Sequence, residues 1–258
     1  MPEAEEPRET GNIIGGEWMR DPLPPRRAPS SLPLIAVPIG DRDVVRAALT
    51  WNLSVEVARL GGRALLVAPA LDGASPLWPT DGERPLGAEL SLTSADSLGE
   101  LYRAAQDLAV ARAVDADEGG IVFVRVPPLW LRKPADAGNL LRWTLLLTTS
   151  DPRELLESYG ITKLLRSTVP AAQVGVTVHG ARGTEEASAA FRRLDDVVRR
   201  RLSHPLTSYG LLVDDLDVYR AIAAQRPIGL AHPQSAAARA LGDVASLLLE
   251  SSREREVA

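Results

Sequence analysis

The sequence predicts an α/β protein with a mostly parallel, doubly wound sheet and helices on both of its faces. From residue 32 onward, short apolar runs alternate with segments of helical periodicity, which is typical of a parallel sheet flanked by helices. The runs are rich in Val, Leu and Ile, as strands buried on both faces should be. With 258 residues and 45% hydrophobic content, the chain is large enough for one such domain and its core.

Strands and helices alternate along the chain. The predicted strands are Leu34–Ile39, Arg63–Val67, Ile121–Val126, Trp143–Thr148, Val174–Val178 and Tyr209–Val213. The predicted helices cover about 44–60, 97–114, 152–166, 184–202, 215–224 and 235–250. Ser97 with Glu100 forms a capping box, and Pro152 follows an N-cap candidate at a position that suits a helix start.

The two ends of the chain differ from the domain between them. Residues 1–31 contain six prolines, which predicts a flexible Pro-rich tail before a domain over 32–251 and a short charged tail over 252–258. The first tail holds an apolar island over 12–19 with Ile14 and Trp18. Exposed aromatic residues in a tail are unfavourable unless another surface buries them. We therefore expect this island either to pack on the chain's own domain or to dock on a partner.

Composition excludes several classes of function. A net charge of −5 and a pI near 5.4 argue against nonspecific nucleic-acid binding. The absence of Cys fits a reducing compartment, and no apolar run approaches the roughly 18 to 20 residues that span a bilayer. The acidic N-terminus lacks the apolar core of a signal peptide. We therefore expect a cytoplasmic protein that neither binds nucleic acid nor inserts into a membrane.

The passage from Leu34 to Val67 reads strand, turn, helix and second strand, and it resembles the start of the MinD/ParA/FlhG group of P-loop ATPases. In that group, a glycine-rich turn with two lysines holds the phosphates at the start of the helix. Later segments extend the resemblance over about 33–250, and those after Tyr209 look most like the FlhG (FleN) branch. The resemblance implies a P-loop NTPase-like fold of the MinD type.

The residues that would hold phosphate are replaced in this chain. Aligned on Gly40 and Asn52, the group's first lysine falls on Asp41 and its second on Arg46. Its glycines and its two Ser/Thr residues fall on Arg42, Asp43, Val45, Ala47 and Ala48. The aspartates would repel a triphosphate, side chains in place of glycine block close approach of the backbone, and alanine cannot bind a metal ion.

Two further positions depart from the group's pattern. Arg125 stands where the resemblance places a metal-side aspartate, and His179 stands in the place of an adenine-contacting Asn. We expect Arg42, Arg46 or Arg125 to pair with Asp41 or Asp43 and so to replace the ligand's charge. Neither a metal site nor a hydrolase triad is predicted, because the three histidines and the serines lack the required spacing.

The preferred interpretation is a catalytically inactive pseudo-ATPase without a cofactor. It would act as a scaffold or regulator in the positioning or assembly of a cell-surface apparatus. Its partner would be an active MinD/FlhG-type paralogue or an apparatus component, in a homodimer or a heterodimer. One alternative is a weak ATPase that binds ATP with Mg²⁺ and uses Arg46 in place of the lysine. Another alternative is a binding module that holds a different small ligand in the pocket where the resembling ATPases bind nucleotide.

Several apolar residues are candidates for the partner surface. A Pro- and Gly-rich stretch over 69–96 lacks clear periodicity, and its Trp78 could refill the vacated pocket. Leu129, Trp130 and Leu131 follow the third predicted strand, at the edge where ligands bind in open α/β sheets. The helix over 184–202 also carries a basic stripe, which is either a solvated face or a surface for an anionic partner.

Overall fold

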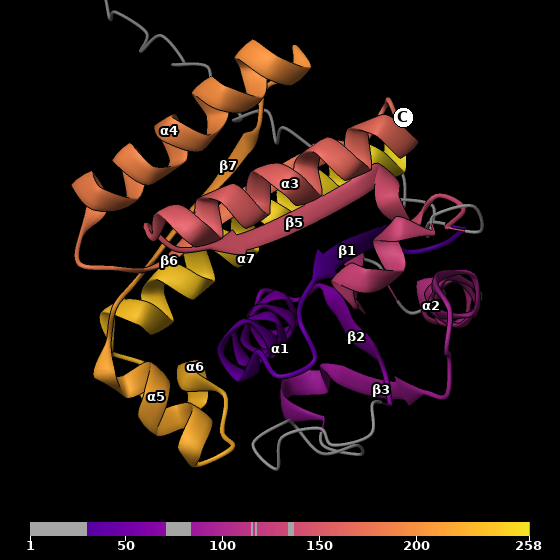
Figure 1. Cartoon of the computed structure of the whole chain (residues 1–258). Coiled ribbons are helices and arrows are strands. Elements are labelled where there is room, and N and C mark those ends of the chain that lie inside the picture. The colour runs from indigo at the N-terminus through magenta and orange to yellow at the C-terminus, as the bar shows by residue number, and fades with distance from the viewer. Residues whose placement is uncertain (1–29, 71–83, 115, 117, 134–136, 258) are drawn as a thin grey trace, which may run out of the picture.

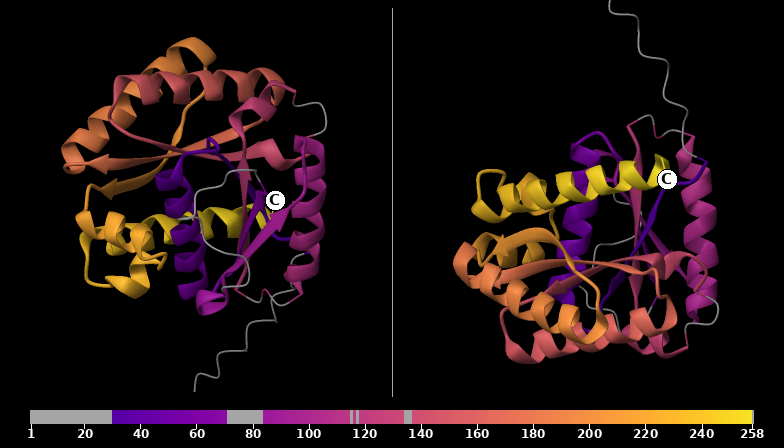
Figure 2. Two further views of the ribbon diagram at one scale, coloured as in Figure 1. Left: turned by 60° about the horizontal axis from the view of Figure 1, so that its bottom comes forward. Right: turned by 90° about the horizontal axis from the view of Figure 1, so that it is seen from above.

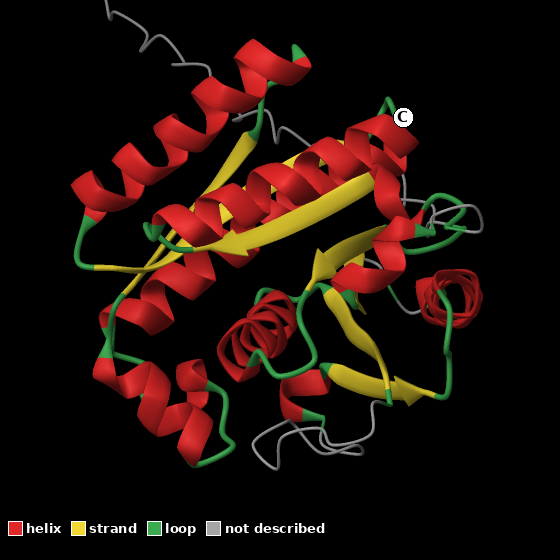
Figure 3. Cartoon of the chain, in the orientation of Figure 1, coloured by secondary structure: helices red, strands yellow, loops and turns green. Residues whose placement is uncertain are grey.

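The computed structural model describes residues 30–70, 84–114, 116, 118–133 and 137–257. Seven strands form one sheet in the order β3-β2-β4-β1-β5-β6-β7, and all of its neighbouring strands are parallel (Figures 1 and 3). The predicted parallel α/β fold is confirmed. Within the described part of the chain, no helix is both long and apolar enough to cross a membrane.

The elements begin and end close to the predicted positions. The strands are β1 (Leu34–Pro38), β2 (Arg63–Pro69), β3 (Glu89–Thr93), β4 (Gly120–Val126), β5 (Trp143–Thr148), β6 (Gln173–Ala181) and β7 (Thr207–Val213). The helices are α1 (Val44–Arg59), α2 (Leu98–Ala113), α3 (Pro152–Thr168), α4 (Thr184–Leu202), α5 (Leu216–Ala223), α6 (Ile228–Ala231) and α7 (Ala236–Val257). In the described part of the chain, short 3₁₀ turns lie at η1 (Pro85–Gly87), η2 (Pro128–Arg132) and η4 (Leu140–Arg142).

Each face of the sheet has its own hydrophobic core. Along β1, Ile35 and Val37 pack with α1 and α7, whereas Ala36 between them faces the cluster that includes α2, α3 and α4. This alternation follows from the two-residue repeat of a strand. Figure 2 shows helices on both sides of the sheet. The arrangement leaves β1 in the middle of the sheet, between β4 and β5.

The sequence prediction missed strand β3, which lies inside the stretch read as aperiodic over 69–96. β3 pairs with β2 at the edge of the sheet, where Leu90 is buried but Leu92 is 44% exposed. Its buried Glu89 is held by Arg63 and Arg112. An edge strand buries only part of its surface, so a search for continuous apolar runs does not find it.

Helix α7 is longer than predicted and reaches Val257, beyond the expected end at 250. Ser252 is fully buried and donates a 2.7 Å hydrogen bond to the Leu249 carbonyl. Arg255 lies 4.5 Å from the centroid of the Trp143 ring, a cation–π contact. The charged residues after Leu249 therefore continue the helix instead of leaving the domain at 252.

Candidate functional site

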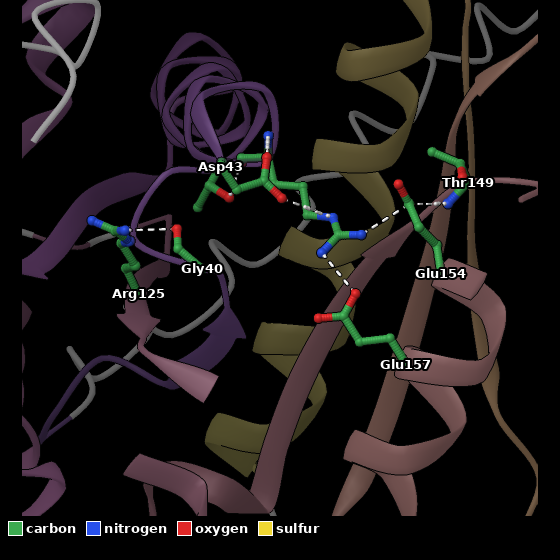
Figure 4. A network of polar contacts seen from close by, with 8 residues as sticks. Gly40, Asp43, Arg125, Thr149, Glu154 and Glu157 are labelled. Carbon is green, nitrogen blue, oxygen red and sulfur yellow. Dashed lines mark hydrogen bonds and ion pairs between the residues drawn. The ribbon is translucent and has the colours of Figure 1, made fainter. Parts of the chain in front are cut away.

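The candidate site is the turn between β1 and α1, at the carboxyl edge of the sheet. The strand order reverses around β1, since β4 and β2 follow on one side and β5 and β6 on the other. Open α/β sheets bind ligands at such a switch point. Figure 4 shows the residues of this turn together with those that reach it from β4, β5 and α3.

Asp43 begins helix α1 and occupies the place where an anion would bind. Its Oδ1 accepts a 3.0 Å hydrogen bond from the backbone N–H of Arg46, so it caps the helix. In a phosphate loop, N–H groups at a helix start are the ones that bind the anion. The side-chain carboxylate of the chain itself therefore satisfies a donor that a phosphate would otherwise use.

Arg46 lies in the first turn of α1, and only 11% of its side chain is exposed. Its guanidinium contacts three carboxylates, with Nη2 2.8 Å from Glu154 Oε2, Nε 3.3 Å from Asp43 Oδ2 and Nη1 3.6 Å from Glu157 Oε2 (Figure 4). The predicted pairing of Arg46 with an aspartate of the turn is present. Its pairing with Glu154 and Glu157 of α3 was not foreseen.

Glu154 connects the turn to the end of β5. The same Oε2 that accepts from Arg46 also accepts a 3.1 Å hydrogen bond from the backbone N–H of Thr149. Burial raises the pKa of the Glu154 carboxyl, but the hydrogen bonds and charge of Arg46 and the Thr149 contact outweigh it and bring the pKa below its usual value. Glu154 is therefore ionised at neutral pH and holds Arg46 in place.

Arg125, on β4, fills the other side of the turn and is 2% exposed. Its Nη2 donates a 2.8 Å hydrogen bond to the Gly40 carbonyl and lies 3.9 Å from Asp41 Oδ1. Burial lowers the pKa of Arg125, and the charges of Asp41 and Asp43 oppose that shift. The second predicted pairing, Arg125 with Asp41, is thus also present. Arg42 is exposed and contributes neither of these contacts.

His179 lies on β6 beside the ion pairs of Arg46, and 9% of the residue is exposed. Burial and the charge of Arg46 lower its pKa, against the opposing influence of Glu154 and Asp43. Its Nε2 has no hydrogen-bond partner among the described residues. A cavity of about 20 Å³ lies next to it, lined also by Val45, Leu49 and Tyr219. That volume holds about one water molecule and is far too small for a purine.

Ala47 and Ala48 point into packed surroundings, with exposures of 1% and 6%. The carbonyl of Ala48 accepts a 2.7 Å hydrogen bond from Asn52 Nδ2, and Asn52 Oδ1 accepts a 2.6 Å bond from the N–H of Ile228. Asn52, which the sequence comparison uses only to fix the alignment, therefore connects α1 to α6 through hydrogen bonds. Among the described residues, no cluster of acidic residues or histidines has the arrangement of a metal site.

The proposed partner surface is only partly exposed. Leu129 is 68% exposed, whereas Trp130 is half-buried against the core on the α2–α3–α4 side. Leu131 is 1% exposed, so its prediction as a partner contact is wrong: in the short helix η2 it turns inward to the core. Trp78, Ile14 and Trp18 lie outside the described residues.

Comparison with known proteins bears on the fold. No protein-family model matches the sequence, and no curated protein matches it. A solved chain of the MinC:MinD cell division protein complex of Aquifex aeolicus matches with a TM-score of 0.63 at 16% identity, covering 84% of this chain and 96% of that one. The septum site-determining protein MinD in complex with Mg-ADP, from Pyrococcus horikoshii OT3, matches with a TM-score of 0.60 at 13% identity. The match covers 84% of this chain and 96% of that one. A ParA family ATPase from Chlorobium tepidum TLS matches with a TM-score of 0.54 at 10% identity, and the match covers 85% of this chain and 99% of that one.

The chain has the MinD/ParA fold. At these identities, the likeness establishes the course of the backbone, and the chemistry depends on the residues of this chain. The residues of its β1–α1 turn do not fit Mg-ATP. Arg46 is held by three carboxylates, Asp43 caps the helix start, and Ala47 and Ala48 offer no hydroxyl to a metal ion. Arg125 adds a positive charge beside Gly40 of the same turn, which disfavours a divalent cation there.

Proposed function

We propose that this protein is a pseudo-ATPase of the MinD/FlhG type that acts in the cytoplasm as a scaffold or regulator. The observation that carries the proposal is the position of Arg46, whose guanidinium is shared by Asp43, Glu154 and Glu157. A residue with these contacts is not available to neutralise a triphosphate. A triphosphate placed at the turn would also meet the carboxylates of Asp41, Asp43 and Glu154 at short range, which disfavours its binding.

The same network supports a fixed surface. A protein with two conformations shifts toward the one that a ligand binds better. Here the internal ion pairs supply the charges that a ligand would bring, and they join α1, β4 and α3 in a single arrangement. We infer that the carboxyl edge of the sheet presents a constant face to a partner. Leu129, which is 68% exposed at this edge, is an apolar residue available to such a partner.

The likeness to MinD supports a protein as the partner. One of the matching solved structures is a complex of MinD with MinC. For this chain, we propose a protein partner, either an active MinD/FlhG-type paralogue or a component of the surface apparatus that the pair helps to position or assemble. The contact would form a homodimer or a heterodimer without bound nucleotide.

Measurements of ATP hydrolysis and of oligomeric state test this function. Purified full-length protein should release no phosphate from ATP with Mg²⁺ above a buffer blank, and its molar mass in light scattering should be the same with and without ATP. Hydrolysis that requires Mg²⁺ and disappears in Arg46→Ala would instead establish the weak ATPase. A ligand-induced rise in melting temperature without hydrolysis would favour the module that binds another small ligand.

A further inference from the structure

An apolar groove lies between α3 and α4, on the face of the sheet opposite α1. It encloses about 310 Å³. Its apolar walls come from α3 and α4, through Pro152, Leu155, Leu156, Tyr159, Leu194 and Val197. Leu155 and Leu194 belong to the core beneath the groove, whereas Leu156 is 70% exposed. An exposed apolar hollow of this kind usually marks a contact with another segment.

Two arginines of α4 complete the lining of the groove. Arg193 and Arg201 are exposed, and neither makes an ion pair or a hydrogen bond with another described residue. Their neighbour Arg199, by contrast, donates a 2.6 Å bond to Asp195. Among the described residues that line the groove, none is acidic. The groove therefore suits a segment that combines apolar side chains with carboxylates.

The chain itself contains such a segment. Residues 1–19 carry five glutamates and one arginine, a formal side-chain charge of 1 − 5 = −4; four of the glutamates precede the apolar island over 12–19, and Glu17 lies within it. We propose that this island docks in the α3–α4 groove, with Ile14 and Trp18 against its apolar walls. The preceding glutamates then lie near Arg193 and Arg201.

The chain enters the domain on the correct side for this contact. Gln106 of α2 donates a 3.1 Å hydrogen bond to Ser31, and the N–H of Leu32 donates to the Ala109 carbonyl at 3.2 Å. Leu32 packs in the same core as the groove residues Leu155 and Leu194. Twelve residue-to-residue steps lead from Trp18 to Ser30 and span up to about 40 Å when extended, several times the spacing of about 8–10 Å between packed helices.

Cysteine pairs test the proposal in the full-length chain, which has no cysteine of its own. Gly16→Cys leaves both anchors of the island intact, and Leu156→Cys changes an exposed groove residue. Under mild oxidation, this pair should form a disulfide within one chain. The matched control pairs Gly16→Cys with Leu216→Cys on α5, because Leu216 is 61% exposed and α5 packs, through Ala221, on the core of the other face of the sheet. We expect the groove pair to react about tenfold faster than the control, owing to its higher effective concentration.

Charge reversal gives the second readout. Arg193→Glu with Arg201→Glu should slow the groove disulfide about fivefold, whereas Arg192→Glu, on the same helix but outside the groove lining, should leave the rate unchanged. Equal rates for the two cysteine pairs, or no effect of the reversed charges, would overturn the proposal. Disulfides found only between two chains would overturn it as well and would make a second copy the occupant.

Discussion

Arg46 Nη2 donates a 2.8 Å hydrogen bond to Glu154 Oε2, although 108 positions separate the two residues in the sequence. The bond joins the first turn of α1 to the first turn of α3 across the carboxyl edge of the sheet. In the proposed function, this bond between two side chains of the protein takes the place of a contact between a positive side chain and a phosphate. The stability of the turn should therefore depend on Glu154.

Replacing Glu154 with Gln should lower the free energy of unfolding by about 1 kcal/mol, because the variant keeps the shape of the side chain and loses its charge. The value allows for the 35% exposure of this side chain. Urea unfolding measures the change. Glu157→Gln is the control: its carboxylate is 49% exposed and 3.6 Å from Arg46, so its loss should cost less than about 0.5 kcal/mol. Equal costs would contradict the account.

The Glu154 effect should depend on pH. Its pKa in the folded protein is lowered, so its contribution is present above the unfolded pKa of about 4.3 and is lost as the pH falls through the folded value. The difference in unfolding free energy between the native protein and Glu154→Gln should accordingly be constant near neutral pH and shrink below about pH 4. A difference that persists at the lowest pH would show that packing, not charge, is responsible.

Asp43 has two roles that substitutions can separate. Asp43→Ala removes both the helix cap and the ion pair, and should cost about 1 to 2 kcal/mol. Asp43→Asn keeps an acceptor for the N–H of Arg46 and should recover most of that loss. Thermal or urea unfolding compares the two variants. If Asn is as destabilising as Ala, the cap contributes little and the charge dominates.

His179 should make the protein less stable in mild acid. Its folded pKa lies below the unfolded value of about 6.5, so its neutral form favours folding above that pH, and this contribution is lost as the pH falls toward the folded pKa. His179→Asn cannot take up the proton. We expect the unfolding free energy of the native protein to fall more steeply from pH 7 to pH 5 than that of the variant; parallel curves would exclude this role.

Leu129 and Trp130 should respond differently to truncation. Trp130 packs against the core, so Trp130→Ala should lower the unfolding free energy by about 2 kcal/mol. Leu129 is 68% exposed, so Leu129→Ala should change it by less than about 0.5 kcal/mol. Urea unfolding measures both. A loss of stability in Leu129→Ala as large as that in Trp130→Ala would remove Leu129 from the candidates for a partner contact.

Much of the fold can be predicted from the sequence because buried parallel strands are continuous apolar runs. Trp143–Thr148 and the helix over 184–202 have the predicted bounds. Strand β3 was missed because an edge strand buries only part of its surface, and its five residues alternate polar with apolar side chains instead of forming a continuous apolar run. The end of α7 was missed because its charged last turns are held by tertiary contacts, such as that of Arg255 with Trp143.

Some contacts of the candidate site could likewise be predicted from the sequence, and others could not. Pairing of Arg46 with Asp43 could be predicted because both residues lie in one turn of helix. The contacts with Glu154 and Glu157 require β5 to lie beside β1, and periodicity along the chain does not reveal strand order. A usable signal was present, since Glu154 follows Pro152 in the first turn after a buried strand. Leu131 could not be distinguished from Leu129 because the short helix η2 sets their directions.

The central claim is that the chain's own carboxylates and arginines fill the phosphate site. Calorimetric titration of ATP with Mg²⁺ into the full-length protein tests it most directly. The account predicts no saturable heat at concentrations up to the millimolar range, and the same result with Arg46→Ala. Saturable binding that requires Mg²⁺ and is lost in Arg46→Ala would contradict it, because Arg46 would then leave Asp43 and Glu154 for the nucleotide.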